Sequence, residues 1–337
     1  MQASSHATVT VLGAGSWGTA LSMLLARNGH TVKLWDRDAA HLQAIAETRE
    51  NRRYLPGIPM PDGILPVAEL GKALQDNDYV LFVVPSAGFR DVLQKTRALI
   101  GNRFNLIWAS KGLEPGSGKF LHQIVDEELP GHSAIAALSG PSFATEVARG
   151  LPTAVTVASR NTEHATAVAA LFHCPRFRAY TCEDVIGVEL GGSIKNVLAI
   201  AAGISDGLGY GANARAALIT RGLAEIMRLG GRLGGHRETF MGLAGVGDLV
   251  LTCTDDQSRN RRLGLALGRG TALDQAVADI GQAIEGLHTA KELDALATQC
   301  DVEMPITGQV KRVLFDGEPA VTAVENLLTR DPKPEAL

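Results

Sequence analysis

The sequence predicts an α/β protein in which an N-terminal domain built on a parallel β-sheet is followed by a C-terminal all-helical domain. Short β-branched runs alternate with helical segments between residues 8 and 140, as in a parallel sheet covered by helices on both faces. From Glu183 onward the chain is rich in Ala, Leu and Gly at helical spacing and has few strand candidates. A chain of 337 residues also exceeds the size at which single cores usually stop growing. We therefore expect domains over residues 1–182 and 183–337.

The expected strands of the first domain are short and mostly apolar. They are TVTVL at 8–12, TVKLW at 31–35, DYVLFVVP at 78–85, FNLIWAS at 104–110, SAIAALSG at 133–140 and LPTAVTVAS at 151–159. The run at 78–85 is apolar without alternation, so it should be buried on both faces and lie centrally in the sheet. Helices are expected from Ser16 to Asn28, with Gly29 at the end, and after Ser86.

Charge and composition argue against several classes of protein. The net charge is -4, and no long basic block could neutralise nucleic-acid phosphates or anionic lipids. The most apolar later stretch, around 185–204, contains Glu189, Lys195 and Asn196, which a lipid-facing span would not carry. The N-terminus lacks the basic region and unbroken apolar run of a signal peptide. We therefore expect a cytoplasmic protein that binds neither nucleic acid nor membrane.

The four cysteines, at positions 174, 182, 253 and 300, show neither Cys-x-x-Cys spacing nor a cluster with histidine. A zinc site or redox pair would need such spacing. We expect reduced thiols and no metal site.

A glycine-rich turn directly follows the first expected strand and precedes the first expected helix. Gly13, Gly15 and Gly18 form a G-x-G-x-x-G pattern. In a Rossmann-type domain the first glycine permits a tight turn, the second lets the backbone approach a pyrophosphate, and the third allows close packing of helix on strand. The free N–H groups of the helix N-terminus then face the phosphates. Such turns also serve plain packing, but the strand–turn–helix context favours a dinucleotide site.

The end of the second expected strand carries two residues with opposite implications for the cofactor. Asp36 stands 18 residues after Gly18, where a carboxylate would accept a hydrogen bond from a ribose 2′-OH and favour NAD. The neighbouring Arg37 would instead suit the 2′-phosphate of NADP. The sequence leaves both cofactors open.

Lys195 is the first candidate for proton transfer. Apolar residues surround it on both helical faces, and Gly191 and Gly192 lie one turn earlier, where they would let another backbone or a substrate come close. Burial disfavours the charged form and lowers the pKa of a lysine, which would make Lys195 a proton donor and acceptor near neutral pH. The alternative is a lysine that reaches the surface or pairs with Glu189.

Two further charged residues are weaker candidates. Lys111 follows the strand at 104–110 and so stands at the carboxyl end of the sheet, where ligands collect in open α/β folds, although most lysines there are solvated. Asp248 lies among glycines and aliphatic residues. It would either cap the next helix or contact a partner such as Lys195, and capping is the favoured interpretation.

The segment DDQSRNRRLG at 255–264 is expected to be a loop leading into a helix, with Ser258, Arg259 and Asn260 near the helix start. An arginine fork together with free N–H groups of a first helical turn suits a phosphate. A solvated basic patch is the alternative.

Taken together, these motifs resemble those of bacterial NAD(P)-dependent glycerol-3-phosphate dehydrogenases. The matching segments extend from residue 8 to about 315. They are GAGSWGTALS (13–22), YLPG (54–57), VVPS (83–86), ASKGLE (109–114), LSGPSFATEV (138–147), the run from GGSIKN to TRGLAE (191–225), GLAGVGDLVLTCT (242–254), SRNRRLG (258–264) and IEG (284–286).

The resemblance implies NAD(P)H-dependent reduction of dihydroxyacetone phosphate to sn-glycerol 3-phosphate, supplying phospholipid synthesis, by what is usually a homodimer. It implies that Lys195 is the catalytic proton donor and acceptor. It implies substrate contacts at Lys111, Gly140, Ser142, Lys195, Asp248, Ser258, Arg259 and Asn260. It implies dinucleotide contacts at Gly13, Gly15, Ser16, Trp17, Gly18, Arg37, Lys111, Ala144, Arg259, Ala283 and Glu285.

Two alternatives remain at this point. A β-hydroxyacid dehydrogenase of the phosphogluconate-like group also joins a Rossmann-type domain to a helical one, but SRNRRLG and GLAGVGD argue against it. A nucleotide-sensing Rossmann protein without turnover would not need a lysine buried in its second domain.

Overall fold

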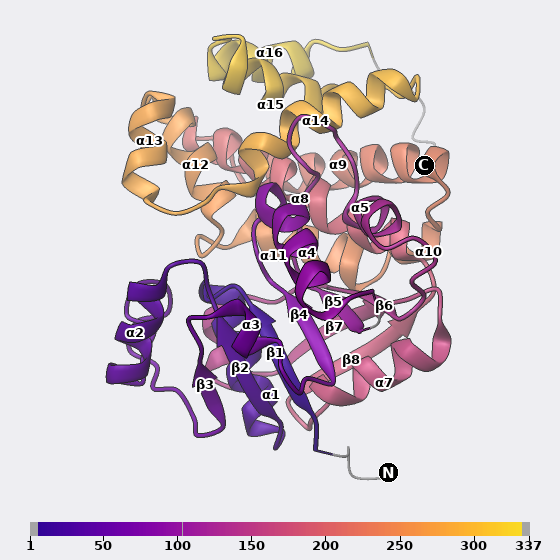
Figure 1. The fold of residues 1–337 in the computed structure, drawn as a ribbon. Helices are drawn as coiled ribbons and strands as arrows, with labels where there is room; N and C mark the ends of the chain where they lie inside the picture. Colours follow the sequence, from indigo (N-terminus) through magenta and orange to yellow (C-terminus); the bar gives the residue numbers. More distant parts are fainter. Residues whose placement is uncertain (1–5, 103, 332–337) are drawn as a thin grey trace. The chain divides into compact units, whose positions relative to one another are not determined.

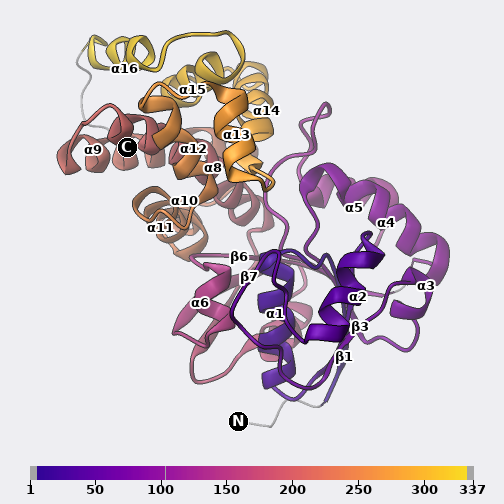
Figure 2. The same cartoon turned by 90° about the vertical axis from the view of Figure 1, so that its left-hand side faces the viewer.

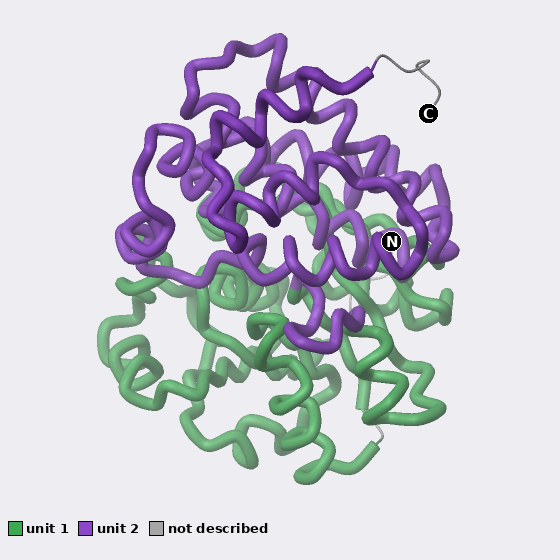
Figure 3. Tube along the Cα trace, turned by 90° about the horizontal axis from the view of Figure 1, so that it is seen from above, with its two compact units in different colours: residues 1–110, 121–185 green, residues 111–120, 186–337 purple. Residues whose placement is uncertain are grey.

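The structure, a computed structural model, describes residues 6–102 and 104–331. By its internal contacts the chain divides into two compact units, coloured separately in Figure 3. Unit 1 comprises residues 1–110 and 121–185, and unit 2 comprises residues 111–120 and 186–337. The segment 111–120, which we expected in the first domain, is thus part of unit 2. Its backbone N–H groups explain why: Gly112 donates to Ser193 Oγ at 3.2 Å and Gly116 to Glu292 Oε1 at 2.9 Å, both in the helical unit.

Unit 1 contains an eight-stranded sheet with the order β3-β2-β1-β4-β5-β6-β7-β8 (Figure 1). The strands are β1 (Thr8–Leu12), β2 (Thr31–Trp35), β3 (Ile64–Pro66), β4 (Tyr79–Phe82), β5 (Asn105–Trp108), β6 (Ile135–Ser139), β7 (Thr153–Ala158) and β8 (Phe177–Cys182). All neighbours pair in parallel except β6 and β7, which are antiparallel. The predicted α/β class is confirmed, and β4 lies centrally as expected. The order reverses beside β1, the position at which such sheets bind ligands.

Two strands were missed by the sequence analysis. β3 has three residues and ends in a proline, so it offers almost no pattern. β8, with the sequence FRAYTC, is an edge strand with mostly half-buried or exposed side chains, so it lacks the apolar run of a buried strand. The antiparallel pairing of β6 and β7 was also not foreseen.

Helices cover both faces of this sheet (Figure 2). They are α1 (Ser16–Arg27), α2 (Ala39–Thr48), α3 (Leu70–Ala73), α4 (Ser86–Ile100), α5 (Leu121–Glu128), α6 (Ala144–Ala148) and α7 (Thr162–Phe172). α1 packs on α6 and α7, while α4 packs on α5. α1 begins at Ser16 as predicted and ends at Arg27, one residue before the expected Asn28, and Gly29 follows with a φ of +89°. A left-handed residue of this kind ends a helix at little cost when it is glycine.

Within its described residues, unit 2 is all helical, as predicted. Its elements are α8 (Val185–Gly207), α9 (Ala212–Leu233), α10 (Arg237–Phe240), the π-helical turn η1 (Leu243–Gly247), α11 (Asp248–Thr254), α12 (Arg259–Gly268), α13 (Leu273–Ile280), α14 (Glu285–Gln299), α15 (Pro305–Phe315) and α16 (Ala320–Leu328). α8 is long and apolar enough to cross a membrane, but 94% of its most apolar window is buried in the protein. It is the central core helix of the unit, with Ile194, Val197 and Leu198 fully buried.

Candidate active site

The glycine turn of unit 1 shows why each glycine is present. Gly13 has a φ of +116°, and a Cβ there would lie 2.7 Å from the carbonyl oxygen of Val83 on the neighbouring strand segment. A Cβ on Gly18 would collide with the carbonyl oxygen of Gly13. A Cβ on Gly15, by contrast, would meet nothing within 4 Å. Internal packing therefore requires Gly13 and Gly18, whereas open space lies beside Gly15.

The N-terminus of α1, which starts at this turn, has no side-chain cap. Its first N–H groups are therefore available to an anion. The indole N–H of Trp17 is buried and has no hydrogen-bond partner among the described residues. Ser16 Oγ donates to the carbonyl oxygen of Tyr54 at 2.9 Å, which ties the turn to the YLPG segment. An uncapped helix end, free space at Gly15 and an unpaired buried donor fit a bound dinucleotide.

Asp36 supports the turn, a role that the sequence analysis did not anticipate. Its Oδ2 accepts from the backbone N–H of Ala14 at 2.8 Å, and its Oδ1 accepts from that of Asp38 at 3.0 Å. Asp38 in turn caps α2, and the hydrogen bond from the N–H of His41 holds the pKa of Asp38 below its ordinary value. Arg37 is exposed and makes no hydrogen bond or ion pair within the described part of the chain. Of these three charged side chains, only Arg37 is free.

The remaining unit 1 candidates lie after β6. Gly140 has a φ of +144°, and a Cβ there would lie 3.0 Å from Val155 Cα on β7. Ser142 Oγ donates to the carbonyl oxygen of Gly140 at 3.1 Å, and Ala144 is the first residue of α6. The close approach of two strands therefore accounts for the glycine in LSGPSF.

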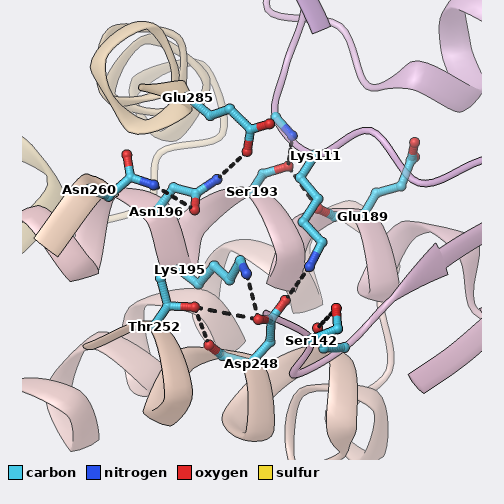
Figure 4. A network of polar contacts seen from close by, with 12 residues as sticks. Lys111, Ser142, Glu189, Ser193, Lys195, Asn196, Asp248, Thr252, Asn260 and Glu285 are labelled. Atoms are coloured by element: carbon cyan, nitrogen blue, oxygen red, sulfur yellow. Dashed lines mark hydrogen bonds and ion pairs between the residues drawn. The ribbon is translucent and has the colours of Figure 1, made fainter. Parts of the chain in front are cut away.

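In unit 2, three charged residues from distant segments meet in a buried network (Figure 4). Lys195 Nζ on α8 lies 2.5 Å from Asp248 Oδ1, and Lys111 Nζ lies 2.7 Å from Asp248 Oδ2. The side chains of Lys195, Lys111 and Asp248 are 9%, 12% and 1% exposed. Two cations thus share one carboxylate. Thr252 lies one helical turn after Asp248, and its Oγ1 donates to the backbone carbonyl oxygen of Asp248 at 2.6 Å.

Burial is the main cause that lowers the pKa of Lys195, Asp248 acts in the opposite direction, and the nearby charge of Lys111 lowers the pKa as well, so that the pKa is about 8. Lys195 therefore does not reach the surface, and its acidic partner is Asp248 rather than Glu189. A lysine with such a pKa can give up and regain a proton close to neutral pH.

The glycine before Lys195 explains how Asp248 arrives at this position. A Cβ on Gly191 would collide with the carbonyl oxygen of Ala244 and lie 3.3 Å from Gly245 Cα. The expectation that another backbone comes close at this glycine is confirmed: the backbone is that of η1, which leads directly into Asp248. π-helical turns of this kind are rare and occur often at functional sites.

The favoured interpretation of Asp248 as a helix cap was wrong. The N-cap of α11 is Gly247, without a side-chain hydrogen bond, and both carboxylate oxygens of Asp248 face lysines. A desolvated ammonium group needs a counter-charge, and this requirement overrides the local preference for capping.

A second polar junction joins α8, α12 and α14 (Figure 4). Asn260 Nδ2 donates to Asn196 Oδ1 at 2.9 Å, and Asn196 Nδ2 donates to Glu285 Oε2 at 3.1 Å. The N–H of Gly286 completes the junction by donating to Asn260 Oδ1 at 2.9 Å. Asn196 was not expected from the sequence to take part in the site. Its signal was an amide in an apolar helix, which is costly unless hydrogen-bonded.

The other unit 2 candidates have simpler surroundings. Ser258 Oγ caps α12 by accepting from the N–H of Arg261 at 3.2 Å. Arg259, the first residue of α12, is half-buried and makes no hydrogen bond or ion pair with the described residues. Ala283 is exposed in the segment before α14. A half-buried guanidinium without a protein partner among the described residues is compatible with both interpretations of this segment, the phosphate site and the solvated basic patch.

Comparisons with known proteins cover both units. Residues 8–165 match the family model described as NAD-dependent glycerol-3-phosphate dehydrogenase N-terminus, and residues 184–325 match the corresponding C-terminus model. A glycerol-3-phosphate dehydrogenase [NAD(P)+] of Thioalkalivibrio sulfidiphilus is 60% identical over 98% of this chain and 99% of its own length.

Two solved structures show the same similarity. The crystal structure of glycerol-3-phosphate dehydrogenase from Coxiella burnetii is 48% identical, has a TM-score of 0.93 and covers 96% of this chain and 99% of its own. The structure of glycerol-3-phosphate dehydrogenase from Saccharomyces cerevisiae is 29% identical, has a TM-score of 0.80 and covers 95% and 99%.

Proposed function

The chain belongs to the family of NAD-dependent glycerol-3-phosphate dehydrogenases, and we propose that Lys195 donates the proton in its reaction. This reaction is the reduction of dihydroxyacetone phosphate to sn-glycerol 3-phosphate with NAD(P)H. The observation that carries the proposal is the buried contact of Lys195 Nζ with Asp248 Oδ1 at 2.5 Å, beside Lys111.

When bound, the reduced nicotinamide supplies the hydride that converts the C2 ketone to an alcohol. Negative charge then develops on the ketone oxygen, where the Lys195 ammonium stabilises it and transfers its proton. Lys111 adds positive charge, and Asp248 holds both ammonium groups in fixed positions, so that little reorganisation is needed during the reaction. In the reverse direction neutral Lys195 accepts the proton from the hydroxyl group, which is why a pKa near 8 suits both directions.

The substrate phosphate is proposed to bind at the start of α12. Ser258, Arg259 and Asn260 lie in this turn, and Arg259 has a guanidinium without a protein partner in the described chain. A guanidinium fork and the N–H groups of a first helical turn both match phosphate oxygens. Gly140 and Ser142 are proposed to complete the substrate site.

The dinucleotide is proposed to bind at the glycine turn, with its pyrophosphate over Gly15 and the N-terminus of α1, where a Cβ would meet only open space. Arg37 would meet the adenosine end. Further proposed contacts are Gly13, Ser16, Trp17, Gly18, Lys111, Ala144, Arg259, Ala283 and Glu285. We also propose that unit 1 is the dinucleotide-binding domain and that unit 2, which includes residues 111–120, is the substrate-binding domain.

The family also suggests the wider setting of the enzyme. We propose a cytoplasmic homodimer whose product supplies phospholipid synthesis. A burial of 94% for the apolar window of α8 supports a chain without a membrane span at this helix.

The decisive experiment follows NADPH absorbance with dihydroxyacetone phosphate for the wild type and for Lys195→Met. Methionine keeps the length of the side chain and the helix propensity but has no proton to give, so kcat should fall at least ~100-fold with an unchanged circular dichroism spectrum. Near-normal turnover would remove Lys195 from the chemistry. A wild type that binds NADPH without turning over would instead indicate a nucleotide sensor.

A further inference from the structure

The helix that carries Lys195 and the helix that begins with the proposed phosphate contacts are in direct backbone contact. A Cβ on Gly203 of α8 would collide with the carbonyl oxygen of Arg261 and lie 2.9 Å from Gly264 Cα. A Cβ on Gly264 of α12 would collide with the carbonyl oxygen of Ile200. One turn later Gly207 repeats the contact, since its Cβ would lie 2.6 Å from the carbonyl oxygen of Leu265. Any side chain here must push the helices apart.

We call residues 258–260 the phosphate turn. Two polar contacts join α12 to α8 at the C-terminal end of this turn. Near Lys195, the turn is held by the hydrogen bond from Asn260 to Asn196. At the far end of α8, Arg261 Nη1 lies 2.5 Å from Asp206 Oδ2. The two anchor positions on α8 are ten residues apart, or about 15 Å along the helix.

Arg261 is a different kind of arginine from Arg259. Its side chain is 8% exposed, its Nε lies 2.9 Å from Asp256 Oδ1, and its backbone N–H donates to the cap Ser258. Asp206, its partner on α8, also accepts from Arg215 Nη1 at 2.7 Å. The charge of Arg261 is therefore used inside the protein, where it ties the residues on both sides of the phosphate turn to α8.

We propose that Arg261 is a positioning residue. Together with the Gly203–Gly264 contact, it fixes the distance between the phosphate turn and Lys195 Nζ. This distance then selects substrates by the number of atoms between their ketone carbon and their phosphate group. The proposal rests on the proposed roles of Lys195 and the phosphate turn. In dihydroxyacetone phosphate a single methylene separates the ketone carbon from the phosphate ester oxygen. With one end held on α12 and the other at α8, a longer substrate misplaces its ketone, and an error on the order of 1 Å can cost about 100-fold in rate.

The test compares two stable phosphonates. In the first, a methylene replaces the ester oxygen of dihydroxyacetone phosphate, and the second has one further methylene. The measured quantity is the ratio of their kcat/KM values in the wild type, Gly264→Ala and Arg261→Lys. The control is Gly231→Ala on α9, a glycine-to-alanine change in a helix where a Cβ meets nothing within 4 Å.

Gly264→Ala should lower kcat/KM for the shorter phosphonate by about 100-fold and should lower that for the longer one much less. The ratio of kcat/KM for the shorter to that for the longer phosphonate should therefore fall at least ~10-fold. Arg261→Lys keeps the charge but loses the second contact of the guanidinium, so it should reduce the preference in the same direction by raising KM for the shorter phosphonate. Gly231→Ala should leave the ratio unchanged. Should Gly264→Ala not fold, Gly268→Ala opens the same contact one turn further from Lys195.

Equal losses for both phosphonates in Gly264→Ala and Arg261→Lys would overturn the proposal, because the contact would then serve stability alone. Unchanged kcat/KM values for both phosphonates in the two folded variants would overturn it as well. Failure of the proposed function is recognised separately, since the wild type would then not reduce dihydroxyacetone phosphate or Lys195→Met would remain active.

Discussion

The glycine turn of unit 1 and the lysine–aspartate network of unit 2 are built in opposite ways. The turn consists of backbone groups and open space: packing requires Gly13 and Gly18, and no atom of the described residues lies within 4 Å of a Cβ placed on Gly15. The network consists of buried charges, with two lysines on one carboxylate that is 1% exposed. Substitutions that change a charge should therefore have small effects on activity around the turn and large effects in the network, because buried surroundings screen charges poorly.

The largest effect is expected for Asp248→Asn. The change leaves Lys195 and Lys111 buried without their counter-charge, and loss of one partner of a buried pair typically costs about 3–5 kcal/mol. Without the attraction of Asp248, the pKa of Lys195 falls further below its present value of about 8. At neutral pH the reduction of dihydroxyacetone phosphate should therefore slow by ~100-fold or more.

The pH profile separates this electrostatic effect from damage to the fold. In the wild type, kcat/KM for reduction should decline as the pH rises through about 8, because Lys195 loses the proton that it must donate, and oxidation should rise over the same range. In Asp248→Asn the declining limb should lie at lower pH. A lower rate with an unmoved limb would contradict the role of Asp248.

The same contrast explains what could be predicted from the sequence. The glycine turn is contiguous, and a local pattern between a strand and a helix marks it, so the packing of Gly13 and Gly18 was expected correctly. The network joins residues 53 and 137 positions apart, so no local pattern shows that they meet. Lys195 itself was found because a lysine in an apolar helix is unusual. Asp248 was misinterpreted because the local capping preference of an acid before a helix is visible, whereas its tertiary partner is not.

Glu225 is a buried acidic residue outside the proposed site. It tests whether burial alone makes the protein sensitive to a change of charge. It is 1% exposed on α9 and accepts from the backbone N–H groups of Ile306 at 2.6 Å and Thr307 at 3.2 Å. These N–H groups belong to the start of α15, which has no cap from its own chain segment. Burial raises the pKa of Glu225 from 4.5 to about 7, against the hydrogen bonds and the charge of Arg228.

Because the folded pKa is the higher one, the stabilisation is complete below the unfolded pKa and is lost as the pH rises through about 7. The loss should amount to about 3 kcal/mol in the free energy of unfolding. Glu225→Gln stays neutral, so its Tm should change less than that of the wild type between about pH 5 and pH 8. Glu325→Gln, at an exposed position on α16, is the control. Parallel Tm curves for wild type and Glu225→Gln would mean that Glu225 is already ionised at the lower pH.

Arg259→Lys tests the proposed phosphate turn. Lysine keeps the charge but loses the planar fork, so KM for dihydroxyacetone phosphate should rise by the equivalent of about 1.5–3 kcal/mol, the value of a hydrogen bond to a charged group. Unphosphorylated dihydroxyacetone should be a very poor substrate of the wild type and should respond little. If both substrates are impaired alike, the phosphate is bound elsewhere.

The smallest effect is expected at the glycine turn, for Arg37→Ala. The two acids beside Arg37 are already engaged: Asp36 accepts from the N–H groups of Ala14 and Asp38, and Asp38 pairs with Arg53 at 3.1 Å. Asp36 is therefore held by the turn, and the unpaired charge at this position is the positive one of Arg37. From that arrangement we expect a preference for the 2′-phosphate of NADPH over the ribose hydroxyl of NADH.

Removing this exposed guanidinium should lower kcat/KM for NADPH by the equivalent of about 1 kcal/mol and should hardly change that for NADH, because the contact is open to solvent. The loss should shrink at high salt, which screens exposed charges. Arg160→Ala removes the same charge from another exposed position of unit 1, where Arg160 lies 3.6 Å from Asp126, and should affect neither cofactor. Equal losses for NADPH and NADH in Arg37→Ala would show that Arg37 contacts a part common to both cofactors. A loss as large as that of Asp248→Asn would contradict the difference between the two regions, since an exposed charge on a backbone-built site would then matter as much as a buried one.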